Sequence, residues 1–177
     1  MSIINVVGAK IWGGGEQYVY DICKQLQQRH RTAYILVDQS NEDMQSRYAQ
    51  VGHVMTANLY TLKGFLSVNA VAKQMKEQGI NTIVCHSGKY ILFCIALKQL
   101  TGAKLVFIKH NLVPGKTDIY HRWINAQVDA FVCVSKLVYD DLMTPAIKDT
   151  SKYHVVYNGI DPNRFQSFSD AVPMKHK

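Results

Sequence analysis

The sequence has no long hydrophobic run. Its apolar stretches fall short of the roughly 20 consecutive residues that a membrane-spanning helix needs, so a protein built on such helices is excluded. The first residues, Met1-Ser2-Ile3-Ile4-Asn5, also lack the basic start and the cleavage site of a secretion signal. These absences predict a cytoplasmic protein.

The sequence has few cysteines, and their spacing does not suggest a metal site or a set of disulfides. Cys23, Cys85, Cys94 and Cys133 show no C-x-x-C pairing, and each lies in an apolar run. A zinc knuckle or a disulfide framework needs regular pairs. The four residues are therefore predicted to be buried thiols.

The usual nucleotide and hydrolase motifs are incomplete. The four glycines between positions 8 and 15 do not have the G-x-G-x-x-G spacing of a dinucleotide site. Gly115-Lys116-Thr117 ends like a Walker loop, but His110 stands where its first glycine belongs. No G-x-S-x-G elbow surrounds Ser87, and no close Asp-x-Asp pair offers a metal-bound diphosphate site. We expect neither a metal nor a bound cofactor.

The chain carries more positive than negative charge. Lys and Arg number 20 against 13 Asp and Glu, which gives a formal net charge of +7. Such a charge favours an anionic partner, which could be a phosphate-bearing ligand, a membrane surface or a nucleic acid. The basic residues are scattered rather than interleaved with aromatics, so nucleic acid is not expected.

Two groups of residues suit contact with an anionic bilayer at the inner face of the membrane. The basic group is Lys24, Arg29, His30 and Arg31, and the amphipathic group is Tyr60, Leu62, Lys63, Phe65 and Leu66. Ordinary structural roles are the alternative, because cations complement a helix C-terminus and apolar helix residues usually belong to the core.

Short β-branched runs alternate with segments of helical periodicity. Strands are predicted over residues 3–8, 33–37, 53–55, 82–85, 104–108, 130–134 and 154–157. Helices are predicted over 15–29, 42–49, 62–78, 89–100, 118–125 and 136–143. Apolar strands without alternation have no solvent face, so the pattern predicts an α/β fold with a doubly wound, Rossmann-like parallel sheet of about seven strands. We expect one domain over 1–157, followed by a hinge and tail over 158–177.

Three successive glycines follow the first predicted strand. Gly13, Gly14 and Gly15 open a helix, where backbone N–H groups can approach a phosphate at the positive helix end. The loop could bind the diphosphate of a donor, and a flexible turn is the alternative. Glu16 suits the first turn of a helix because it complements the helix dipole.

Polar residues also follow three later strands. His86, His110 and Asn111 end two of them, and the carboxyl ends of parallel strands line one crevice. His110 could donate a hydrogen bond to an anionic or carbonyl oxygen, or be a satisfied loop histidine. His86 could contact an acceptor. Ser135 should cap the next helix, and Lys136 could face the crevice or solvent.

Two segments resemble retaining glycosyltransferases of the GT-B fold, family 4. Trp12-Gly13-Gly14-Gly15-Glu16-Gln17 is similar to the glycine loop of the N-terminal domain in that family. Val156-Tyr157-Asn158-Gly159-Ile160-Asp161, with Phe165 beyond it, resembles the hinge between the two domains. The resemblance covers essentially the whole chain. It departs from the common pattern at Gly15, where Ala is usual, and at Asn111, where Gly often follows the histidine.

The resemblance implies an N-terminal, acceptor-side domain. It identifies His110 as the active-site histidine and Asn158, Gly159 and Asp161 as hinge residues. The implied activity is transfer of a sugar, with retention, from a nucleotide-diphosphate-sugar to a sugar or lipid-linked acceptor. In the family a C-terminal donor-binding domain carries the paired carboxylates, so this chain alone should be inactive. The alternative is a non-catalytic binding or recruiting subunit of a two-subunit transferase.

Overall fold

The computed structural model describes residues 2–60, 64–143 and 150–159. The strands are β1 (Ile3–Val7), β2 (Tyr34–Asp38), β3 (His53–Ala57), β4 (Thr82–Cys85), β5 (Lys104–Lys109), β6 (Ala130–Cys133) and β7 (Tyr153–Val155). The helices are α1 (Gly14–Gln28), α2 (Glu42–Tyr48), α3 (Gly64–Glu77), α4 (Ile91–Thr101), α5 (Ile119–Gln127) and α6 (Lys136–Leu142), and a 3₁₀ turn, η1 (Gly88–Tyr90), precedes α4.

All seven strands form one parallel sheet in the order β3-β2-β1-β4-β5-β6-β7. The chain first adds strands on one side of β1 and then crosses over to add β4 and its successors on the other side. The loops after β1 and β4 therefore diverge, and they open a crevice at the carboxyl edge of the sheet. This is the topological switch point of the fold.

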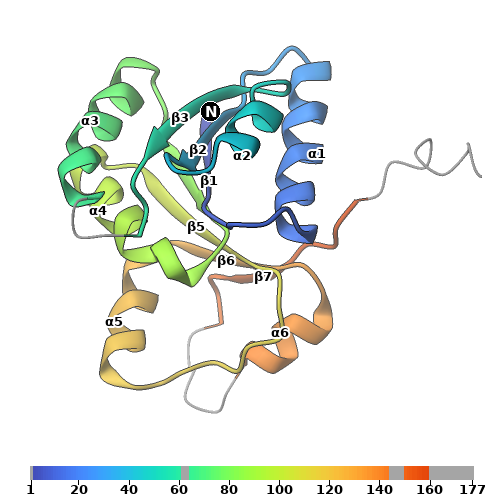
Figure 1. The fold of residues 1–177 in the computed structure, drawn as a ribbon. Helices are drawn as coiled ribbons and strands as arrows, with labels where there is room; N and C mark the ends of the chain where they lie inside the picture. The colour runs from blue at the N-terminus through green and yellow to red at the C-terminus, as the bar shows by residue number, and fades with distance from the viewer. Residues whose placement is uncertain (1, 61–63, 144–149, 160–177) are drawn as a thin grey trace, which may run out of the picture.

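Helices cover both faces of the sheet, because its central strands are apolar on both faces. Figure 1 shows α1 and α2 on one side and α3 and α4 on the other. Alternate residues of β1 belong to different cores: Val7 packs with Val19 and Tyr48, whereas Ile4 and Val6 pack with residues of α3 and α4. The α/β, doubly wound arrangement expected from the sequence is confirmed.

The elements follow their predicted ranges closely. The boundaries differ by a few residues, and η1 forms what the sequence predicted as the first turn of α4. One expectation needs correction: β3 and β7 are not buried on both faces, because they are the two edge strands and have exposed positions. The four cysteines are free and buried, as predicted. None of the helices in the described ranges is long and apolar enough to cross a membrane.

Asp129 joins α4 to the second half of the sheet. Its Oδ2 accepts hydrogen bonds from Nζ of Lys98, at 2.7 Å, and from the backbone amide of Leu105, at 2.8 Å. Burial raises the pKa of Asp129, but these bonds and the charges of Lys98 and Lys104 outweigh burial and lower it. The carboxylate thus fixes the start of β5, whose far end carries His110.

We expect Asp129→Ala to lower the free energy of unfolding by about 1.5–3 kcal/mol, the range for a lost hydrogen bond to a charged group. Urea unfolding at pH 7 measures the loss. The matched control is Asp140→Ala, which removes an exposed ion pair with Lys136 and should cost clearly less, because exposed ion pairs contribute little to stability. Equal losses in the two variants would contradict the role given to Asp129.

Candidate functional site

A pocket of about 350 Å³ lies at the carboxyl edge of the sheet, at the switch point between β1 and β4. Its walls come from the loops after β1, β3, β4 and β5. The lining residues are Ala9, Gly14, Gly15, Glu16, Tyr60, His86, Ser87, Lys89, Tyr90, His110 and Asn111. The structure therefore brings together Gly14, Gly15, His86, His110 and Asn111, which the sequence singled out from separate segments.

The two histidines of the pocket contact each other. Nδ1 of His86 lies 3.0 Å from Nε2 of His110, and the two ring planes are inclined by 24° with their centroids 5.3 Å apart. Nε2 of His86 lies 3.1 Å from Oδ1 of Asn5, a buried residue of β1. Tyr18 packs its ring edge-on against both imidazoles. These contacts hold His110 by its Nε2 side.

Both histidines are uncharged at neutral pH. Burial, with a further contribution from His110, lowers the pKa of His86 to about 3. Burial also lowers the pKa of His110 from its ordinary value. A positive charge on either ring would lose its hydration without a carboxylate partner in this pair. The pocket therefore presents neutral imidazoles rather than cations.

The glycine loop offers backbone donors at the start of α1. The amide of Gly13 donates to Oε2 of Glu16 at 3.1 Å, so the side chain of the helix itself takes this donor. The amides of Gly14 and Gly15 belong to the first turn and have no preceding helical carbonyl to bind. A Cβ at Gly15 would lie 3.8 Å from Cδ2 of His110, an ordinary contact, so the Ala usual in the family would fit here.

A second, smaller cavity of about 280 Å³ adjoins the pocket and shares Ala9 and Tyr60 with it. Its charged residues are Lys10 and Asp38. Burial raises the pKa of Asp38, but hydrogen bonds from Ser40 and from the amide of Leu59, and the charge of Lys10, outweigh burial and lower it. The cavity thus offers an ionised carboxylate beside the candidate site.

The remaining predicted site residues do not line the pocket. Ser135 caps α6 by accepting from the amide of Val138. Ser87, which does line the pocket, accepts from the amide of Lys89 and so caps η1. Lys136 donates to Asp140 at 2.7 Å within α6, and both side chains are exposed. Asn158 and Gly159 are exposed beyond β7. Asp161 and Phe165 lie outside the described residues, and the hinge stays a prediction.

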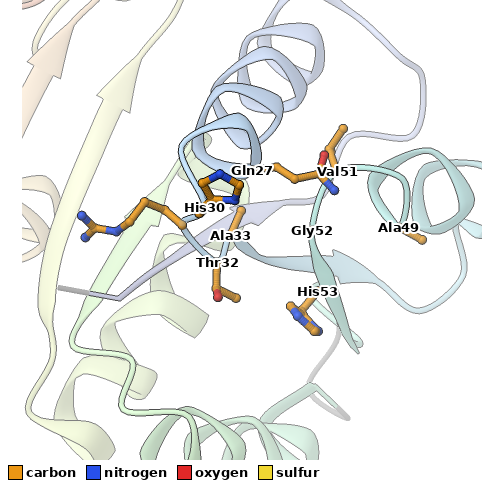
Figure 2. A pocket seen from close by; sticks show the side chains of 9 residues that line it. Gln27, His30, Thr32, Ala33, Ala49, Val51, Gly52 and His53 are labelled. Atoms are coloured by element: carbon orange, nitrogen blue, oxygen red, sulfur yellow. The ribbon is translucent and has the colours of Figure 1, made fainter.

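The basic group at the end of α1 lies at the opposite edge of the sheet. His30, Arg31 and His53 line a cavity of about 480 Å³, and Figure 2 shows His30 and His53 beside the amino ends of β2 and β3. Tyr60 follows β3 at the carboxyl edge, and strands of five residues separate the two edges by about 17 Å. The basic group and Tyr60 therefore lie at opposite edges of the sheet. Leu62 and Lys63 lie outside the described residues.

Sequence reasoning missed Asn5, Tyr18, Lys89 and Tyr90. Asn5 carried a usable signal, because it is a polar residue inside the apolar run of β1, and a buried amide needs partners. The ring of Tyr90 packs directly against the backbone of Gly8. Even a Cβ atom added at Gly8 would lie only 2.9 Å from that ring. Nothing in the spacing of the sequence indicates that contact. No cluster of three or more metal-ligating side chains occurs in the part of the chain that the structure describes.

A family model described as Glycosyltransferase Family 4 matches residues 12–164. The chain belongs to this family. The match begins in the glycine loop and ends beyond Gly159, and it includes every residue of the pocket except Ala9. No curated protein sequence matches the chain.

Solved structures similar to this family 4 chain are about twice its length, and they include glycosyltransferases and a UDP-GlcNAc 2-epimerase. A glycosyltransferase from Rickettsia africae has a TM-score of 0.77 and 18% identity, and the match covers 95% of this chain and 45% of that one. HepE from Anabaena, solved with UDP-glucose, has a TM-score of 0.71 and 19% identity, with 93% and 46% covered. MurG from Acinetobacter baumannii has a TM-score of 0.63 and 13% identity, with 98% and 50% covered. The shared fold is that of the N-terminal half of a GT-B enzyme.

The low pKa of His86 predicts an acid-dependent loss of stability. The unfolded chain binds a proton on this histidine below about pH 6.5, whereas the folded chain does not until about pH 3. Stability should therefore fall as pH drops through this window, by about 1.4 kcal/mol per pH unit for one proton. Urea unfolding at pH 7 and pH 5 measures the slope.

We expect His86→Gln to reduce the loss between pH 7 and pH 5 by about 2 kcal/mol. Tyr18→Phe is the control, since it keeps the ring contacts and should keep the slope of the wild type. A slope unchanged by His86→Gln would show that this histidine is not held neutral.

Proposed function

We propose that the chain is the acceptor-side half of a retaining glycosyltransferase that moves a sugar from a nucleotide-diphosphate-sugar to a sugar or lipid-linked acceptor. The observation that carries the proposal is the pocket at the switch point, where first-turn amides of α1 and two neutral histidines face one cavity. Similar folds, including HepE solved with UDP-glucose, support the choice of donor class. The reaction itself requires a second, donor-binding domain.

The exposed apolar side chains support a covering domain. Among the described residues, all the exposed large apolar side chains except Leu100 and Val155 lie in loops after strands or in the first two turns of the next helix. They are Ile11, Tyr60, Leu66, Leu92, Leu112, Val113, Ile119, Tyr120, Trp123, Leu137, Val156 and Tyr157. This is the carboxyl edge of the sheet. Apolar surface collected on one edge is typical of a surface that another domain covers.

Different residues of the pocket would bind the diphosphate and the hydroxyl groups of the substrates. The amides of Gly14 and Gly15, together with Lys89, which lines the same pocket, would supply hydrogen bonds and positive charge for the diphosphate. His110 and Asn111 follow the end of β5 and line the same pocket, where they would contact the transferred sugar or the hydroxyl of the acceptor. Catalysis by this half is then a matter of positioning and fixed dipoles.

The second domain would contribute the paired carboxylates and the remaining contacts to the donor. This half alone would therefore bind weakly and turn over nothing, and the segment after β7 would act as the hinge. We place the enzyme in the cytoplasm, with a lipid-linked acceptor reached from the inner face of the membrane. The identity of the sugar would depend mainly on the second domain.

We expect residues 1–177 to transfer no sugar from a panel of UDP-, GDP- and ADP-sugars. Addition of the donor-binding half, encoded beyond Lys177 or on a separate chain, should give turnover, with a product of unchanged anomeric configuration by proton NMR. In that two-domain enzyme His110→Ala should lower kcat/KM by about 100-fold, because a misplaced reactant costs about that much.

The matched control is His53→Ala, which removes a histidine from the opposite edge of the sheet and should leave kcat/KM unchanged. Turnover by residues 1–177 alone would contradict the division into halves. If the two-domain protein binds nucleotide-sugars without turnover, the alternative of a non-catalytic recruiting subunit is favoured.

A further inference from the structure

Three side chains from three strands form a chain of contacts that ends at the pocket. Asn5 lies in the middle of β1, His86 follows β4 and His110 follows β5. Oδ1 of Asn5 is 3.1 Å from Nε2 of His86, and Nδ1 of His86 is 3.0 Å from Nε2 of His110. Asn5 and His86 are buried. Both ring nitrogens of His86 are therefore occupied, and it has no nitrogen left for a ligand.

The amide of Asn5 sets the direction of this chain of hydrogen bonds. Its Nδ2 points to Sγ of Cys23 at 3.9 Å, a fully buried thiol on α1. Burial raises the pKa of Cys23 to about 12, so the sulfur stays a thiol and can accept weakly. The amide nitrogen is thus directed to α1, and its oxygen, which can only accept, faces His86.

The direction of the Asn5 amide then determines which nitrogen of each histidine carries the proton. A neutral imidazole carries one N–H. Because Nε2 of His86 must donate to Asn5, Nδ1 of His86 has no proton and must accept. Nε2 of His110 must therefore donate to it, and Nδ1 of His110 is left as a bare lone pair. Among the described residues no group is hydrogen-bonded to that Nδ1.

We propose that Asn5 and His86 are positioning residues that fix His110 as the Nε2–H tautomer, so that Nδ1 of His110 accepts a hydrogen bond from a ligand hydroxyl. This assignment reverses the donor role that the sequence suggested for His110. A phosphate oxygen, which only accepts, is not a partner for this atom, whereas a hydroxyl is. That the hydroxyl belongs to a sugar rests on the proposed function.

The distribution of ligand groups in the pocket follows from the tautomer. Anionic oxygens go to the amides of Gly14 and Gly15 and to Lys89, and a hydroxyl goes to His110. Tyr18 packs against both rings and keeps them in place without taking either nitrogen, since only ring contacts join them. A ligand that has phosphate and hydroxyl groups close together matches both parts.

NMR of the ¹⁵N-labelled protein at pH 7.5 tests the direction of the hydrogen bond between His86 and His110. A scalar coupling across an N–H···N bond identifies the nitrogen that donates. We expect the proton between the rings to be attached to Nε2 of His110 and coupled to Nδ1 of His86. A proton attached to Nδ1 of His86 instead would overturn the proposal. The variants His110→Gln and His86→Phe each remove one imidazole, so the signals that disappear in each variant are assigned to that histidine.

Asn5→Leu tests the positioning role, because it keeps the size of the side chain and removes the acceptor. We expect the slowly exchanging Nε2–H of His86 to disappear and the coupling to His110 to weaken or vanish. Tyr18→Phe is the control and should keep both signals. An unchanged coupling in Asn5→Leu would show that Asn5 does not set the tautomer.

If Asn5→Leu does not fold, His86→Phe answers the same question. It should move both ¹⁵N shifts of His110 toward those of a mixture of tautomers, and unchanged shifts would overturn the proposal. The spectra need no nucleotide-sugar and no second domain. A failed tautomer assignment therefore leaves the transferase proposal standing, and absence of turnover leaves the tautomer assignment standing.

Discussion

The hydrogen bond between Asn5 and His86 ties the candidate site to the centre of the sheet. A parallel sheet covered by helices on both faces has little room for polar side chains, so its polar chemistry collects at the strand ends. Asn5 is an exception in the middle of β1, and it is satisfied on both sides, by His86 and by Cys23 of α1. Through it, the position of His110 depends on how α1 packs against β1.

The fold was readable from the sequence because each strand is a short β-branched run and each helix has a regular apolar period. The candidate residues were readable in part, because the ends of parallel strands meet at one edge. That rule brought His86, His110 and Gly15 to one pocket, as found. It could not reveal the contact between the two histidines, which depends on ring orientation.

Other features depend on packing that a linear pattern does not contain. The edge position of β3 follows from strand order, and its short predicted range, 53–55, gave only a hint. The ion pair of Lys136 with Asp140 is an i,i+4 contact that the helix prediction allowed but did not single out. The approach of Tyr90 to Gly8 brings together residues 82 positions apart in the sequence, and Tyr90 lines the pocket.

Tyr60 belongs to both cavities at the carboxyl edge, with Gly8 close to its hydroxyl. One aromatic ring therefore borders both the compartment beside His110 and the compartment beside Asp38. A substitution at position 60 would change the shape of both compartments at once.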